Sequence, residues 1–148
     1  MALAVFLGIS SDRDGRWTAN LTKQYLSQDD PALAGWLPES GGIIYSVDMT
    51  VFNDLFFRNP SAPWRYVMGF ESALMLPEDL AVAHNVAWNY GDLRGYDPWV
   101  KKMRPQDRLI ITEGWLPTSG LTRGANIPEL EWHRTANAWW IGRLPRKP

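Results

Sequence analysis

The chain has 148 residues, of which 45% are hydrophobic and 21% are charged, and it contains no cysteine. Its length is enough for one domain with its own core, and its composition is ordinary for a globular protein. The formal net charge of -1 provides no overall field to attract nucleic acid, and the lack of cysteine excludes disulfides and thiolate sites. We therefore expect one domain over residues 1–148 that does not bind nucleic acid.

The N-terminal segment has two interpretations. Residues Met1 to Ile9 are apolar, but they are far fewer than the ~20 that a membrane-spanning helix needs. They also lack the basic flank and the cleavage site of a signal peptide. The segment is therefore either a first strand or, together with the polar residues up to Arg16, a stub or linker from an upstream membrane segment.

A compact β-α-β unit is predicted in the middle of the chain. Apolar runs at residues 42–47 and 64–70 predict its two strands. Between them, Asp48 provides a helix-capping side chain, apolar residues follow at helical spacing, and Asn59 with Pro60 ends the helix. This short helical connection favours two parallel strands with a right-handed crossover.

A longer helix is predicted next, because Pro77 has the fixed φ angle that suits a first helical position. Its expected buried face consists of Leu80, Ala83, His84 and Ala87. Residues 97–103 are expected to form one or two further helical turns.

The last third of the chain adds two strands and a helix to the prediction. The apolar run at residues 108–112 predicts a third strand. Residues 128–135 are expected to begin a last helix, and residues 137–144 a terminal strand. The short connection before that strand favours antiparallel pairing at an edge of the sheet.

These elements predict an α/β fold with a two-layer or three-layer, Rossmann-like mixed sheet. The sheet is expected to be mostly parallel, with an antiparallel C-terminal edge strand. The residues expected in its core are Ile43, Val47, Leu55, Phe56, Val67, Leu80, Ile110 and Ile111.

Three carboxylates follow the three predicted parallel strands: Asp48, Glu71 and Glu113. Ligands of open α/β sheets bind in the crevice at the carboxyl ends of the strands. The three side chains could therefore bind a divalent cation or act as acid and base on a sugar. The alternative is that each one caps the next helix or faces solvent.

Two tryptophans and one histidine complete the set of candidate binding residues. Trp64 and Trp115 flank the strands that carry the carboxylates, where they could stack on a sugar ring or cover the sheet edge. Of the two histidines, His133, between Trp132 and Arg134, is the better candidate for a site, whereas His84 is expected to be a packed, hydrogen-bonded side chain. Glycine-rich phosphate loops, a nucleophile elbow and a paired-histidine metal motif are absent from the sequence, so no catalytic residue is assigned and no cofactor is expected.

Three stretches of the chain resemble a known family: Ile43 to Asp48, Phe52 to Pro60 and Tyr66 to Glu71. In this order they are similar to the soluble C-terminal domain of polytopic, glycosyltransferase-like bacterial membrane proteins of the lipid-linked sugar type. The resemblance covers about the middle third of the chain. It departs from the family at Met49, where the family favours Trp, and at Glu71-Ser72, where it favours Asp-Pro.

The resemblance implies a non-catalytic, extracytoplasmic accessory or binding domain of a membrane sugar-transfer protein. Its partners would be the membrane portion of its own parent chain and carbohydrate. The alternative is a free-standing, cytoplasmic enzyme: a metal-assisted hydrolase or a sugar-binding enzyme that uses Asp48, Glu71 and Glu113 with a divalent cation. A third alternative is an interaction module, in which exposed aromatic side chains form one surface patch.

Overall fold

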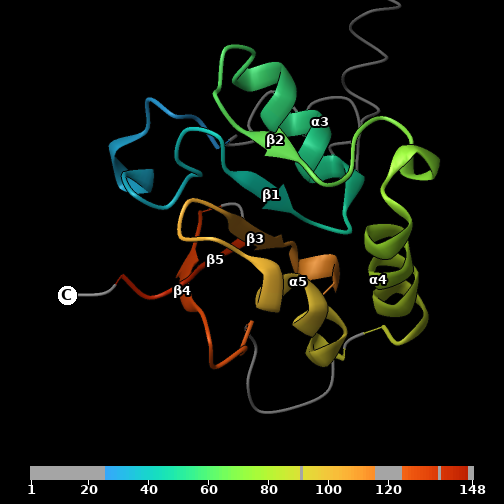
Figure 1. Ribbon diagram of the computed structural model, residues 1–148. Coiled ribbons are helices and arrows are strands. Elements are labelled where there is room, and N and C mark those ends of the chain that lie inside the picture. Colours follow the sequence, from blue (N-terminus) through green and yellow to red (C-terminus); the bar gives the residue numbers. More distant parts are fainter. Residues whose placement is uncertain (1–25, 91, 116–124, 137, 147–148) are drawn as a thin grey trace, which may run out of the picture.

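The structure is a computed structural model that describes residues 26–90, 92–115, 125–136 and 138–146 (Figure 1). The N-terminal segment, with its two interpretations as a strand or as a membrane-segment stub, lies outside these ranges. Within them, no helix is both long enough and apolar enough to cross a membrane.

Five strands form one open sheet in the order β2-β1-β3-β5-β4. They are β1 (Ile43–Tyr45), β2 (Arg65–Tyr66), β3 (Arg108–Ile111), β4 (Glu131–Arg134) and β5 (Trp140–Arg143). β1 pairs in parallel with β2 and β3, whereas β5 pairs antiparallel with β3 and β4. The predicted α/β class with a mixed sheet is confirmed, but with two pairs of each kind the sheet is not mostly parallel.

The prediction for the C-terminal part was wrong in two respects. Residues 131–134 form strand β4 where a helix was expected, and β5 lies between β3 and β4 instead of at the edge. The cause is a tight turn, in which the Thr135 N–H donates to the Trp139 carbonyl at 2.8 Å and Ala138 has a φ of 62°. This turn folds β4 back onto β5, so that β4 becomes the edge strand.

Helix α3 (Met49–Arg58) has the ends that the sequence predicts. The Asp48 side chain accepts hydrogen bonds from the Thr50 N–H at 2.9 Å and from its hydroxyl at 2.7 Å. At the other end the Asn59 side chain, which is buried, donates to the carbonyls of Leu55 and Leu26 and accepts from the Gln28 N–H. Local capping therefore defines the predicted helix, and Asn59 ties it to the preceding segment.

Helices cover both faces of the sheet, which makes the fold three-layered (Figure 1). On one face, Ile44, Ile110 and Ile141 pack against α3 and against residues 26–37, which include the 3-10 helix η1 (Pro31–Leu33). On the other face, Tyr45, Leu109 and Ile111 pack against α4 (Pro77–Trp88), η3 (Leu93–Tyr96), α5 (Asp97–Lys102) and the short η4 (Glu113–Trp115). The 3-10 helix η2 (Ser72–Leu74) precedes α4 and has no buried residue.

Most of the expected core is confirmed, with one clear exception. Val47, Leu55, Ile110 and Ile111 are buried, and the expected residues Ile43, Val67 and Leu80 are partly buried against them. Phe56, in contrast, is 39% exposed. The buried stripe of α3 runs through Val51 and Leu55, and one residue further along a helix turns the side chain by about 100°, which carries Phe56 out to the surface.

The buried face of α4 also differs from the prediction. Asp79, Val82, Ala83 and Val86 are buried, whereas the expected His84 and Ala87 are exposed. The helix is rotated so that the Asp79 carboxylate reaches α5, where it accepts a hydrogen bond from the Trp99 indole at 2.7 Å. Hydrophobic periodicity does not predict such a rotation, because it counts an acidic residue as exposed.

Candidate functional site

The three predicted carboxylates do not meet in one crevice. Asp48 caps α3, and its second oxygen accepts a hydrogen bond from the Thr112 hydroxyl at 2.6 Å. Glu113, next to Thr112, is exposed and pairs with Arg134 of β4 at 3.0 Å. Glu71 is exposed and makes no capping hydrogen bond. In the described ranges no group of three or more acidic or histidine side chains is arranged to hold a metal ion.

The reason lies in the length of β2. This strand ends at Tyr66, five residues before Glu71, so Glu71 does not stand at the carboxyl end of a strand. Asp48 and Glu113 do follow the neighbouring strands β1 and β3, which explains the hydrogen bond from Thr112. The prediction was therefore right about two adjacent strand ends and wrong about the third.

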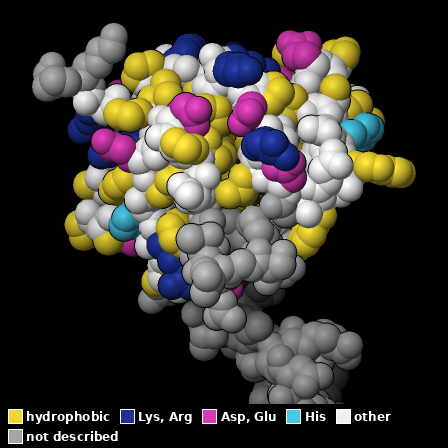
Figure 2. Space-filling view, turned by 90° about the horizontal axis from the view of Figure 1, so that it is seen from below, with side chains coloured by type: hydrophobic (Ala, Val, Ile, Leu, Met, Phe, Trp, Pro, Cys, Tyr) yellow, Lys and Arg dark blue, Asp and Glu magenta, His cyan; other side chains and the backbone are white. Residues whose placement is uncertain are grey.

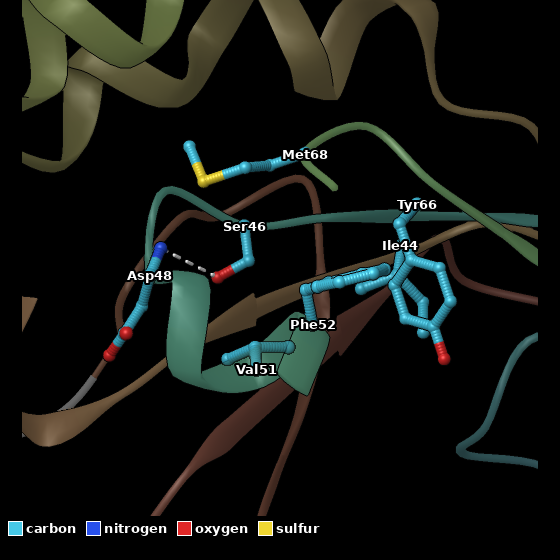
Figure 3. Close-up of a pocket in the computed structure, with 7 residues that line it drawn as sticks. All are labelled: Ile44, Ser46, Asp48, Val51, Phe52, Tyr66 and Met68. Carbon is cyan, nitrogen blue, oxygen red and sulfur yellow. Dashed lines mark hydrogen bonds between the residues drawn. The ribbon is translucent and has the colours of Figure 1, made fainter. Parts of the chain in front are cut away.

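A small cavity lies beside Asp48 but does not involve its carboxylate. It has a volume of about 10 Å³, room for roughly one water molecule, and Ser46, Phe52 and Met68 are among its lining residues. Figure 3 shows the Asp48 oxygens turned away from this cavity, while the Ser46 hydroxyl accepts from the Asp48 N–H at 3.2 Å. This cavity is too small to hold a substrate.

Tyr96 carries a buried polar atom near the same end of the sheet. Its hydroxyl has no hydrogen-bond partner among the described residues. Burial, and after it the negative charge of Asp48, raises the pKa of Tyr96. The hydroxyl therefore stays protonated in the folded protein.

The other three candidate binding residues take part in packing. Trp64 is buried, and its indole donates to the Tyr66 hydroxyl at 3.0 Å. Trp115 is half-buried, with its ring 5.8 Å from that of Tyr90. His133 is half-buried on β4, where its ring stacks on Trp36 at 5.0 Å. The three residues lie in separate parts of the fold.

Three phenylalanine side chains form an exposed aromatic surface, two of them on α3 and one on the segment that follows β2. Phe56, Phe57 and Phe70 are 39%, 70% and 58% exposed. Their ring centroids lie 5.6 to 6.4 Å apart, and the buried Phe52 supports the group from below, with its ring 4.7 Å from that of Phe70. We call Phe56, Phe57 and Phe70 the phenylalanine surface. Its rings are held in place by one another.

A groove of about 320 Å³ opens on the opposite face of the sheet. Its floor is the α4 and α5 side of β1 and β2, and its walls are the segment from Leu74 to Leu76, the start of α4, and the end of α5. Leu74 and Leu76 are 80% and 61% exposed. The groove is thus lined by uncovered aliphatic side chains on one side.

The other side of the groove is polar. Asp79 is 4% exposed, and its Oδ1 accepts from the Trp99 indole and from the Lys102 ammonium group. Tyr45 is 3% exposed and lines the groove beside Lys102, whose Nζ lies 5.7 Å from the ring centroid. Arg65 of β2 completes this side. Among the described residues, neither the Tyr45 hydroxyl nor the Arg65 guanidinium has a hydrogen-bond or ion-pair partner.

Tyr45 should make the stability of the fold change with pH in the alkaline range. Burial, followed by the charges of Asp107 and Asp79, raises its pKa from 10.0 to about 12. Between these values the unfolded chain releases a phenolic proton that the folded chain keeps, so we expect the free energy of unfolding to fall as the pH rises from 10 to about 12. Chemical denaturation at a series of pH values measures this fall.

Tyr45→Phe is the matched variant for this measurement. It should make the fall shallower, because the remaining decline then comes from the half-buried Tyr66 and the buried Tyr96, whose pKa values burial also raises. An identical slope in the variant and the parent would contradict the assignment.

The sequence contains no signal for this groove. Tyr45 occupies a strand position typical of core residues, and Asp79 occupies the first turn of a helix, where acidic residues are common. The residues that line the groove come from β1, β2, η2, α4 and α5, and only the tertiary fold brings them together.

The charged residues on the molecular face drawn in Figure 2 are mixed. Lys and Arg alternate there with Asp and Glu among hydrophobic side chains, and no large area has one sign in the described part of this face. A comparison with protein-family models, with curated proteins and with solved structures gave no match.

Proposed function

We propose that the chain is a non-catalytic accessory domain of a membrane-anchored sugar-transfer protein, and that its phenylalanine surface binds the membrane portion of its own parent chain. In this proposal the domain lies on the extracytoplasmic side, needs no cofactor, and has carbohydrate as a second partner. The observation that carries the proposal is the exposure of Phe56, Phe57 and Phe70.

The stretch by which the chain resembles the membrane sugar-transfer proteins contains two kinds of residue. Leu55 is fully buried, and Asn59 holds the end of α3 through its side-chain hydrogen bonds. Phe56 and Phe57 lie in the same run and are exposed. Packing and capping explain Leu55 and Asn59, whereas Phe56 and Phe57 have large apolar side chains outside the core. Contact with a partner would account for their exposure.

Physical considerations favour such a contact. Aromatic side chains bury roughly 150–250 Å² each and dominate the energetics of interfaces. Contiguous apolar patches on a protein surface commonly mark interaction sites. The described tryptophans do not form such a patch: Trp88 is 91% exposed on α4, whereas Trp64, Trp99 and Trp139 are buried. The phenylalanine surface is therefore the stronger candidate.

The β1-α3-β2 unit supports the finer part of the fold prediction. Its parallel strands and connecting helix have the arrangement of a Rossmann-like unit, so we keep a Rossmann-like relationship as part of the proposal. In such a unit α3 is a rigid element, and rigid elements present binding residues with less loss of entropy than loops do.

The test uses the complete gene product in its native membranes. A photo-crosslinking amino acid replaces Phe57, and crosslinked peptides are identified by mass spectrometry. We expect crosslinks from this position to a membrane-embedded segment of the same polypeptide.

The matched control has the same amino acid in place of Trp88, an exposed aromatic residue outside the phenylalanine surface. It should give no crosslink to that segment. The proposal fails if position 57 crosslinks only to a second copy of the chain, if both positions give the same products, or if the gene product has no membrane-embedded segment.

A further inference from the structure

We propose that the groove between β1, β2 and the start of α4 is a binding site for a small amphiphilic carboxylate, an alkyl chain of medium length with one carboxylate group. The site is separate from the phenylalanine surface and does not depend on the proposed function. The carboxylate would bind at the Tyr45 and Arg65 side, and the alkyl chain along Leu74 and Leu76.

The groove contains a tyrosine hydroxyl that is free to bind a ligand. Tyr45 is 3% exposed and lines the groove, and its hydroxyl has no hydrogen-bond partner among the described residues. The hydroxyl is not among the fully buried polar atoms, so it is accessible from the groove. A tyrosine hydroxyl is protonated at neutral pH and can donate a hydrogen bond to a bound carboxylate.

Asp79 fixes the position of Lys102 in the groove. Its Oδ1 accepts two hydrogen bonds, from the Trp99 indole and from Lys102, and this pairing fixes the Lys102 ammonium group beside Tyr45. Asp79 therefore neutralises Lys102 and holds its ammonium group beside Tyr45.

The groove carries a net positive charge. The groove contains two cations, Arg65 and Lys102, and one anion, Asp79, which leaves one positive charge. Arg104 and Asp107, which also act on Tyr45, form an ion pair at 3.0 Å and cancel each other. A carboxylate carries the single negative charge that matches this balance, whereas a phosphate monoester carries about 1.5 to 2 charges at neutral pH.

The opposite wall of the groove is aliphatic. Leu74, Leu76 and Val67 provide aliphatic surface, and two of these side chains are mostly exposed. Sugar rings bind to proteins by stacking on flat aromatic faces, whereas alkyl chains bury well against aliphatic ones. A volume of about 320 Å³ is at the lower end for small-molecule sites and suits a short chain.

Octanoate is the probe for this site, with octyl phosphate and octyl glucoside as comparison ligands that have the same chain. The Trp99 indole N–H resonance in a ¹⁵N–¹H spectrum is a built-in reporter, because this group donates to Asp79 at the groove. We expect octanoate to shift this resonance with saturation, and to bind at least several times more tightly than the phosphate and the glucoside.

Two variants test the assigned residues. Tyr45→Phe removes only the hydroxyl, and Arg65→Gln removes a charge from an exposed residue. Each should weaken octanoate binding by about tenfold to a hundredfold, the range expected for a hydrogen bond to a charged group. Arg58→Gln removes an exposed arginine on α3, away from the groove, and should leave the affinity unchanged.

Three outcomes would overturn the proposal. The first is the absence of any saturable shift of the Trp99 resonance with octanoate. The second is equal or tighter binding of octyl phosphate or octyl glucoside, which would assign the groove to a different ligand chemistry. The third is octanoate binding that both Tyr45→Phe and Arg65→Gln leave unchanged.

Discussion

Asp107→Ala is expected to lower the free energy of unfolding by about 2–5 kcal/mol, because each buried hydrogen-bonding group left without a partner costs about 1–3 kcal/mol. Asp107 is fully buried at the start of β3. Its Oδ1 accepts from the Ile43 N–H at 2.8 Å, and its Oδ2 accepts from the Arg104 N–H at 2.8 Å. The alanine variant leaves both backbone donors without a partner where β1 and β3 begin.

Chemical denaturation of the parent and the variant measures this effect. Asp92→Ala is the matched control, because Asp92 also pairs with an arginine, Arg94, but is exposed. An ion pair between exposed side chains contributes little, so the control should change stability far less than Asp107→Ala does. Similar losses in the two variants would show that the Asp107 carboxylate does not join the two strands.

Leu55→Ala is expected to destabilise the fold by about 2–5 kcal/mol, through lost burial and the cavity that remains. Leu55 is fully buried between α3 and the sheet, in the cluster that contains Ile44 and Ile110. Phe57→Ala, two positions further along the same helix, removes a larger side chain that is 70% exposed. Its expected effect is only about 0.5 kcal/mol, as for surface substitutions in general.

Thermal unfolding of both variants in parallel gives the comparison directly. The sequence alone places Phe56 in the core and so predicts a large loss of stability for Phe56→Ala as well. Because Phe56 is 39% exposed, we expect its loss of stability to lie between those of Leu55→Ala and Phe57→Ala. A larger loss for Phe57→Ala than for Leu55→Ala would mean that α3 is rotated from the orientation described above.

The β1-α3-β2 unit could be predicted because its signals are local. Asp48 caps the helix that it precedes, Pro60 follows the helix end, and apolar runs flank both. Each of these effects acts over a few residues, so the printed sequence contains all the information that they need. The same applies to α4, which begins at Pro77 as predicted.

The strand order and the groove could not be predicted, because they depend on residues far apart in the chain. A stretch such as Glu131 to Arg134 has no alternating pattern, and it becomes a strand only because the turn after Thr135 pairs it with β5. Tyr45 and Asp79 likewise look like a core residue and a helix-start residue. Only the packing of α4 on α5 shows that they line one groove.

The carboxylate site is an intermediate case. Asp48 and Glu113 follow the neighbouring parallel strands β1 and β3, as predicted, and the hydrogen bond from Thr112 to Asp48 joins these two strand ends. The prediction fails for Glu71, because β2 has two residues and ends well before it. The apolar run from residue 64 to residue 70 indicated a longer strand, and sequence periodicity alone cannot show where inter-strand hydrogen bonding stops.

Both open edges of the sheet are poor templates for another strand. The edge strand β2 has only two residues, and the edge strand β4 carries Glu131 and Arg134, which form ion pairs with Arg143 and Glu113. Short length and charged side chains at an edge are the means by which β-proteins resist aggregation. In the part of the chain that the structure describes, these two edges therefore oppose amyloid-like, edge-to-edge polymerisation at high concentration.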